Sequence, residues 1–398
     1  MELVYKGDNK HTYATSIAAT WVWAPAIFVA SSMAYFNGLY GFLWFLVPNF
    51  LTLILFGYIT QHFCNTKDTT KFVNVVDVIP HKRQKILHSS VSAILNVAST
   101  AVQIIGLHTL LQIFFPGIPL YISAMLVSIF CYIYTKLGGI KTCIISDKYK
   151  YFIMLLVGLI LVGVIITKSD IDNINLYGLN NPDFIDISLS TGIIGAIGLF
   201  SAPFVDNTFW QRVFSIEKTE VFKTFCWSSL YFLIIPTLFG LIGFLASSFI
   251  TSNEWVITNT FGDNLYIKCL LSIAIFSALI ATIDSNLCAI YSLSSKLLES
   301  VKDYSMELSL LIASCVVIIF EPTILQMWLV YGTIRTAIAI PTTLIIYNKF
   351  DENRLFYSTL CAVLIGSFGY LTMVLLNLPY GYIFTIFALL FPLLGYKH

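Results

Sequence analysis

The sequence predicts an all-α integral membrane protein with about twelve transmembrane helices. Of its 398 residues, 58% are hydrophobic and only 11% are charged, whereas about 25% of the residues of a soluble domain are charged. Many apolar runs reach the roughly 20 residues that a helix needs to cross about 30 Å of hydrocarbon. The alternating ten-residue pattern of a β-barrel does not occur in these runs. A bundle of apolar helices is therefore expected.

The apolar runs are separated by short polar connections, of which the longest has about 25 residues. The predicted spans are 12–36, 39–61, 87–115, 117–136, 146–168, 187–213, 220–249, 266–297, 304–320, 322–347, 355–377 and 379–396. No connection is long enough for a soluble domain, so we expect one transmembrane domain over residues 1–398. The start of the chain is polar and the first run is too long for a cleavable signal peptide. Insertion is expected to use the first helix itself.

Basic residues are distributed unevenly between the two sets of connections. Lys168 and Lys268 fall on one side, Arg335 lies within a span, and all other basic residues lie on the opposite side or at its edge. Loops rich in lysine and arginine stay in the cytoplasm. The prediction is a multi-pass protein of the cell (plasma or inner) membrane with both termini cytoplasmic.

The stretch from Gly198 to Gln211 carries Ser201, Pro203, Asp206 and Asn207 inside an apolar span. Proline removes a backbone donor and clashes with the preceding turn, and freed carbonyls at membrane depth must be satisfied by protein or water. A broken helix is predicted; the alternative is a proline kink packed against a neighbour. A second proline, in the first span, lies five spans earlier. This is the spacing of a five-plus-five inverted repeat whose first and sixth helices are discontinuous.

Four stretches carry a resemblance to a known family. They are Ala19–Pro25 with Gly38–Trp44, Tyr134–Lys141 followed by Ser146 and Asp147, Phe204–Arg212, and Ala281–Leu287. These are similar to motifs of the sodium:solute symporter family, which includes sodium/glucose, proline and urea symporters. The resemblance implies a LeuT-like, amino-acid-transporter-like core over about residues 12–347, with two additional helices over about 355–396. Most members have one more helix before the first core helix, whereas this sequence begins at the core.

The resemblance also implies sodium as the coupling ion, at one or two sites. The first site would use the backbone carbonyls of Thr20, Trp23 and Ala278 and the hydroxyl of Thr282. Neutral oxygen ligands suit a hard cation that must also leave again. The family usually has a serine immediately before that threonine, and here the residue is Ala281.

A second sodium site would use Asp147, Asp284 and Ser285. The alternative for Asp147 is an ion pair with Lys148 or Lys150 at the cytoplasmic edge. Asp284 lies deep in an apolar span, where a charge costs roughly 2.5–3.5 kcal/mol or more, so it needs a cation or a basic side chain as partner.

The solute is expected to bind where the two helix breaks face each other. The residues predicted for this site are Trp23, Gln103, Phe200, Ser201, Asp206, Asn207 and Tyr331. Asp206 follows the proline, so its carboxylate should accept free backbone N–H groups in the first turn of the second half-helix. Arg335 is a candidate counter-ion of Asp206.

Together these features predict a sodium-coupled secondary active symporter that imports a small polar solute of the urea, amino-acid, sugar or monocarboxylate class. The alternative is a solute-sensing or regulatory relative without coupled transport, which Ala281 favours and the absence of an appended signalling domain disfavours. No phosphate-binding loop, metal cluster or nucleophile–base pair indicates an enzyme. No basic block indicates nucleic acid, the eight cysteines are scattered, and no obligate protein partner is inferred beyond the lipid bilayer.

Overall fold

The computed structural model describes residues 2–180, 183–250, 256–261, 264–297, 299–376, 378 and 380–397, and these residues form helices without a β-strand. The long helices are α1 (Lys10–Trp21), α2 (Ala24–Thr66), α3 (Lys82–Gln112), α4 (Leu120–Ile166), α6 (Ile193–Val205), α7 (Asn207–Ser215), α8 (Val221–Ala246), α10 (Leu265–Leu297), α11 (Ser305–Phe320), α12 (Ile324–Ile346), α13 (Glu352–Leu375) and α14 (Gly381–Leu390). Two short helices, α5 (Phe184–Ile187) and α9 (Val256–Asn259), lie in connections. The prediction of an all-α membrane protein is confirmed.

Every predicted span coincides with a helix. Nine helices in the described part of the chain are long and apolar enough to cross a membrane. Two of them, α2 and α4, each extend over parts of two predicted spans. A glycine with non-helical backbone, Gly38 in α2 and Gly139 in α4, both at φ 61°, lies between those spans. The short helix α9 was not predicted, and residues 377 and 379, at the ends of the last two predicted spans, lie outside the described residues.

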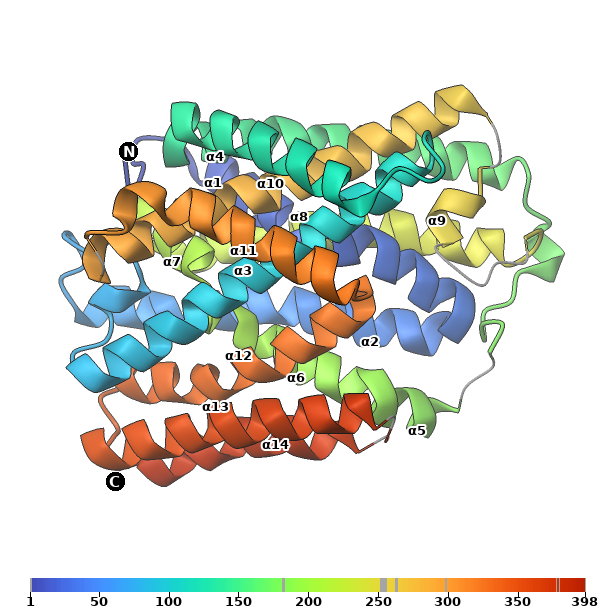
Figure 1. The fold of residues 1–398 in the computed structure, drawn as a ribbon. Coiled ribbons are helices and arrows are strands. Elements are labelled where there is room, and N and C mark those ends of the chain that lie inside the picture. The colour runs from blue at the N-terminus through green and yellow to red at the C-terminus, as the bar shows by residue number, and fades with distance from the viewer. Residues whose placement is uncertain are drawn as a thin grey trace.

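The chain crosses the bundle so that both of its ends lie at the same end of the bundle (Figure 1). The N- and C-termini lie at the same end, whereas α5 and α9 lie at the opposite end (Figure 1). The last two helices, α13 and α14, pack side by side along one flank of the bundle. The even number of crossings explains why the termini share a side.

Two helices are interrupted inside the bundle. The first break lies at Val22 and Trp23, between α1 and α2, and Pro25 stands in the first turn of α2. The second lies at Asp206, between α6 and α7. Helix α6 continues through Pro203 for two residues, so this break lies three residues later than the proline itself. Proline disturbs mainly the turn before it, and α6 ends where Asp206 can cap the next helix.

Side chains satisfy the backbone groups at the second break. The carboxylate of Asp206 accepts the Thr208 N–H at 2.9 Å. The indole of Trp210 donates to the Phe204 carbonyl at 3.1 Å. Asn207 accepts from the Val75 N–H at 3.0 Å and donates to the Ala289 carbonyl at 3.1 Å. Protein side chains therefore form hydrogen bonds with backbone groups at the break, as is necessary where no water is available at membrane depth.

Two glycines bring α12 close to α6 beside this break. A Cβ atom added to Gly198 of α6 would lie 3.1 Å from the Cα atom of Gly332 on α12. Small residues permit such close backbone approach between membrane helices. The neighbours of Gly332 on α12, Tyr331 and Arg335, thereby reach the interior next to the break.

Candidate functional site: a cavity between the two helix breaks

A cavity of about 40 Å³ lies where the two breaks face each other. Its lining residues come from α1, α3, α6, α7, α10 and α12 and from the two breaks: Thr20, Trp21, Trp23, Ser92, Leu95, Asn96, Ser99, Ala202, Val205, Asp206, Phe209, Thr282, Asn286, Tyr331 and Arg335. A water molecule needs about 10–15 Å³ by this measure, so the cavity has room for about three. The cavity is therefore too small for an organic solute in this structure.

Several polar atoms facing this cavity have no hydrogen-bond partner among the described residues. They are the indole nitrogens of Trp21 and Trp23, the Asn96 Oδ1 atom, the Tyr331 hydroxyl, and the Nε and Nη2 atoms of Arg335. All of these atoms are buried. Buried polar groups in proteins are nearly always paired, and an orphan calls for a missing ligand, water or ion. Most of these orphans are donors, so the cavity suits an acceptor-rich group.

Among the residues with these atoms, Arg335 has the greatest need of a partner, because its guanidinium group is always charged. Its side chain is only 5% exposed, and its guanidinium lies 4.9 Å from the centre of the Tyr331 ring, one helical turn away. Asp206 lines the same cavity, but the two residues form no ion pair within 4.0 Å. The ring of Trp23 meets that of Tyr331 edge-on, with centroids 5.4 Å apart. The Asp206 carboxylate and the Arg335 guanidinium thus line the same cavity as the rings of Trp23 and Tyr331, without forming an ion pair with each other.

Three of the four oxygens predicted for the first sodium site, those of Thr20, Ala278 and Thr282, lie together, and Thr20 and Thr282 line the cavity. The Thr282 hydroxyl is 3.3 Å from the Thr20 carbonyl and 3.2 Å from the Ala278 carbonyl. Thr20 belongs to the last turn of α1, where carbonyls have no partner within the helix. The Trp23 carbonyl lies in the break itself and accepts the Ala26 N–H at 2.9 Å. Ala281, which is fully buried, contributes no hydroxyl.

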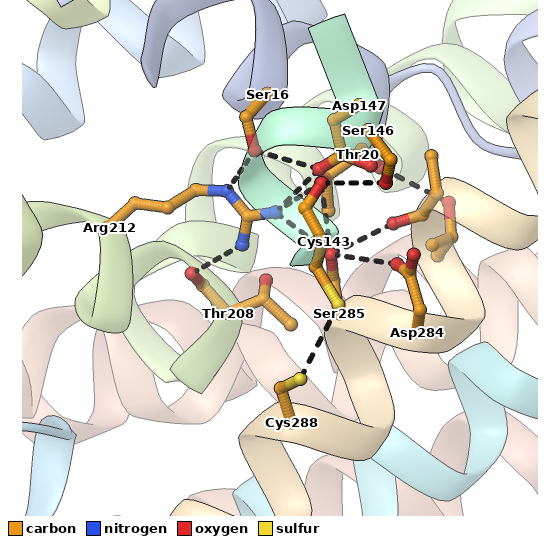
Figure 2. Close-up of polar contacts among 12 residues, drawn as sticks. Ser16, Thr20, Cys143, Ser146, Asp147, Thr208, Arg212, Asp284, Ser285 and Cys288 are labelled. Carbon is orange, nitrogen blue, oxygen red and sulfur yellow. Dashed lines mark hydrogen bonds and ion pairs between the residues drawn. The ribbon is translucent and has the colours of Figure 1, made fainter. Parts of the chain in front are cut away.

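The residues predicted for the second sodium site also meet, but around two basic side chains. Arg212 of α7 donates through Nη2 to Asp147 at 3.1 Å, to Ser285 at 2.8 Å and to Thr20 at 2.7 Å (Figure 2). Lys150 of α4 lies 3.1 Å from Asp147 and 2.6 Å from Asp284. We call these four charged residues, Asp147, Lys150, Arg212 and Asp284, the charged cluster.

The charged cluster is enclosed and joins four helices. Both carboxylates and the guanidinium are fully buried, and the Lys150 side chain is 12% exposed. Ser16 of α1 donates to Asp147 at 2.7 Å and accepts from Arg212 at 3.1 Å. Helices α1, α4, α7 and α10 are therefore held together by one network, and Thr20 belongs both to this network and to the cavity.

A basic side chain occupies the position between the two aspartates where the second sodium ion was predicted. The position between their carboxylates is taken by the ammonium group of Lys150, which touches both. At an effective dielectric constant near 20, a further cation 4 Å from Lys150 or Arg212 would be repelled by about 4 kcal/mol. The partner that Asp284 requires is thus a basic side chain, the second of the two options given by the sequence.

Three of the seven predicted solute-site residues, Trp23, Asp206 and Tyr331, line the cavity, and the other four do not. Gln103 lies one turn beyond Ser99 on α3, and its amide donates to the Ser99 carbonyl at 3.3 Å. The Ser201 hydroxyl bonds within its own helix, and Phe200 neighbours it on α6. The side chain of Asn207 is used at the break, as described above.

Arg212 was missed as a site residue, and Lys150 was named only as an alternative partner of Asp147 at the cytoplasmic edge; the structure has this pair at 3.1 Å, with Asp147 buried. Each lies near the end of a predicted span, so both were counted with the basic residues of the cytoplasmic edge. A signal was available, because an ionisable residue inside an apolar span is a functional candidate by default. Lys150 also follows Asp147 by three residues, which places the two on one helix face.

The fold is that of multi-pass membrane transporters. Among solved structures, the chain is similar to a Na⁺-coupled sialic acid symporter in a substrate-bound outward-open state, with 16% identity, a TM-score of 0.72, and coverage of 97% of this chain and 88% of that one. It is also similar to Mhp1, a nucleobase-cation-symport-1 family transporter solved with bromovinylhydantoin bound, with 12% identity, a TM-score of 0.65 and coverage of 97% and 91%. A manganese transporter of Eremococcus coleocola gives 13% identity, a TM-score of 0.61 and coverage of 98% and 88%.

Sequence comparison gives a shorter match. The chain is 36% identical over 98 residues to a sodium-dependent multivitamin transporter of Oryctolagus cuniculus, which covers 25% of this chain and 14% of that protein. No family model matches the chain. The similar proteins named here are transporters, in agreement with the prediction that the protein is not an enzyme.

Proposed function

We propose that the protein is a secondary active transporter of the sodium:solute symporter type, which moves a small polar solute across the cell membrane by alternating access. The observation that carries this proposal is the cavity at the two helix breaks, lined by buried polar atoms without partners. Discontinuous helices near the bilayer midplane form the solute sites of many secondary transporters. The small volume of the cavity means that the helices around it must separate to admit a solute.

The chemistry of the cavity favours a solute that carries a carboxylate. The free Nε and Nη2 atoms of Arg335 form a fork that matches two carboxylate oxygens. The Tyr331 hydroxyl and the Trp23 indole add two more donors on the same cavity. Asp206 offers an acceptor for an amino group. Of the urea, amino-acid, sugar and monocarboxylate classes, the amino acids satisfy both charges, and monocarboxylates satisfy Arg335 alone.

We propose a single sodium ion as the coupling ion, bound by the carbonyls of Thr20, Trp23 and Ala278 and the hydroxyl of Thr282. Two of these carbonyl oxygens, those of Thr20 and Ala278, already lie 3.3 and 3.2 Å from the Thr282 hydroxyl. They join the break after α1 to α10 beside the cavity, so an ion there would favour the same arrangement of helices that encloses the solute. Binding of sodium and binding of the solute would then favour the same conformation, and this is how two binding sites become coupled.

Uptake into liposomes tests the proposal. Purified protein is reconstituted, a sodium gradient is imposed, and uptake of radiolabelled amino acids, monocarboxylates, urea and sugars is compared with uptake in choline medium. Accumulation of a carboxylate-bearing solute that collapses when the sodium gradient is dissipated would support the proposal. Solute binding without any accumulation would indicate the sensor-type alternative instead.

Variants of the hydroxyl at the sodium site should change sodium affinity in opposite directions. We expect Thr282→Ala to weaken apparent sodium affinity about fivefold, which corresponds to roughly 1 kcal/mol for one lost ion–hydroxyl contact. Ala281→Ser should strengthen it by a similar factor because it adds a hydroxyl next to the same site. Sodium dependence of uptake and of thermal stability measures both. The proposed site is wrong if both variants bind sodium like the parent.

The orientation of the protein is open to a direct labelling test. In a background where the exposed cysteines Cys269 and Cys315 are serine, a membrane-impermeant thiol reagent should label Asn180→Cys from outside intact cells and should not label Thr70→Cys. The expectation follows from the excess of lysine and arginine on the side of Thr70. The reverse pattern of labelling would overturn the proposed cytoplasmic location of both termini.

A further inference from the structure

We infer that Lys150 and Arg212 are built-in replacements for a cation between Asp147 and Asp284, so the charged cluster binds no sodium and the protein takes up at most one sodium ion per cycle. The inference concerns the acidic site alone. It stands whether or not the site at Thr282 binds sodium.

Protein donors already bind three of the four carboxylate oxygens of the two aspartates. Asp147 accepts from Lys150 through Oδ1 and from Ser16 and Arg212 through Oδ2. Asp284 accepts from Lys150 through Oδ2 at 2.6 Å, and its Oδ1 lies 3.3 Å from the Ser285 hydroxyl, which makes its shorter bond, at 2.8 Å, to the Ala281 carbonyl. Ser285, the remaining predicted ligand, is itself an acceptor for Arg212 at 2.8 Å. Every ligand predicted for the ion therefore already binds a protein donor.

The charges of the cluster balance without an added ion. Two carboxylates face one ammonium and one guanidinium group, and three of the four side chains are fully buried. An added sodium ion would leave a net positive charge in this enclosed position, where charges are costly unless paired. The two cations also come from different helices, α4 and α7, so the match between acids and bases is a property of the assembled fold.

Besides balancing charge, Arg212 and Lys150 connect helices to one another. Arg212 links α7 to α1 through Ser16 and Thr20, the latter at 2.7 Å. Lys150 links α4 to α10 through Asp284. A bound ion would make such links only while it is present, whereas tethered cations make them in every cycle. The cluster thus fixes α1, α4, α7 and α10 to one another without depending on sodium concentration.

The number of sodium ions bound by the purified protein tests the inference. We expect equilibrium binding of radioactive sodium to saturate at no more than one ion per chain for the parent. Lys150→Gln removes the ammonium group and leaves Asp284 with space and charge for an ion, so one additional sodium ion should bind. The double variant Lys150→Gln/Asp284→Asn removes the carboxylate as well and should return to the parent value, while Lys150→Arg should not gain an ion.

Two ions bound to the parent, or no gain in Lys150→Gln when that variant is folded, would overturn the inference. The parent measurement decides the matter even if Lys150→Gln fails to fold. If the parent binds one ion, Thr282→Ala shows where it lies: binding weakened about fivefold, or more, places the ion at the carbonyl and hydroxyl site, as expected. Unchanged sodium affinity in Thr282→Ala combined with loss of binding in Asp284→Asn would place the ion in the charged cluster and contradict the inference. A parent that binds no sodium would contradict only the proposed sodium coupling.

Discussion

Replacing Arg335 with glutamine is expected to abolish uptake of carboxylate-bearing solutes while leaving the protein at least as stable as the parent in the absence of solute. The guanidinium is buried, and two of its nitrogens have no hydrogen-bond partner among the described residues, so a neutral amide in its place should be less costly to bury. Hydrogen bonds to charged groups contribute about 1.5–3 kcal/mol each. The loss of two such bonds to the solute corresponds to at least roughly 100-fold in affinity. Uptake in liposomes and thermal unfolding in detergent measure the two effects.

Two control variants separate solute binding from folding. Arg335→Lys keeps the charge but lacks the planar fork, so it should retain only part of the affinity for a carboxylate. Tyr331→Phe removes one donor from the same cavity and should cause a smaller loss. If Arg335→Gln unfolds at a lower temperature than the parent and still transports the solute, Arg335 is a structural residue and the proposed solute chemistry is wrong.

Replacing Arg212 with glutamine is expected to have the opposite signature, a large loss of stability. Arg212 makes hydrogen bonds with Ser16, Thr20, Asp147 and Ser285 while fully buried. Removing one partner of a buried ion pair costs about 3–5 kcal/mol because the other charge is left uncompensated. Unfolding should therefore occur at a clearly lower temperature or denaturant concentration than for the parent, measured in sodium-free buffer.

The matched control is the double variant Arg212→Gln/Asp147→Asn, which removes both charges of the pair. It should recover part of the stability, because an uncharged amide is far less costly to bury than a lone carboxylate. Equal stability of the parent and Arg212→Gln would show that the network around Arg212 contributes little to the fold.

The sequence predicted the helices well because the relevant information is local. Length and hydropathy define a span, and all twelve predicted spans coincide with helices. The position of the second break was predicted less well. Proline marks where a helix is weakened, but the end of α6 at Val205 depends on the capping by Asp206 and on the bond from Trp210 to Phe204.

The candidate site was harder to predict because it depends on which helix faces meet. Ala202 and Val205 of α6 line the cavity, whereas Ser201, which is adjacent to Ala202, does not. The Ser201 hydroxyl has a partner within its own helix. Because Ser201 also lies one turn from Val205, spacing in the sequence alone could not exclude it from the solute site.

The pairing of acids with bases in the charged cluster could not be predicted from a single sequence for a different reason. Asp147 and Arg212 are 65 positions apart and Lys150 and Asp284 are 134 apart, and nothing in local pattern pairs them. The two acids were named from the resemblance to the family, and Asp284 also because a carboxylate deep in an apolar span needs a partner. The bases were assigned to the membrane edge, where lysine and arginine usually lie.

The balance of charge within the cluster has an electrical consequence. When α1, α4, α7 and α10 change their tilt, the two acids and two bases move through the membrane field together, and their net charge is zero. The membrane potential, which acts on a moving charge with about 2.3 kcal/mol per elementary charge per 100 mV, therefore has no net charge of the cluster to act on. One sodium ion carried with a zwitterionic amino acid would produce a current of one charge per solute, and one carried with a monocarboxylate anion would produce none. Current recorded during uptake would thus reveal the charge of the solute.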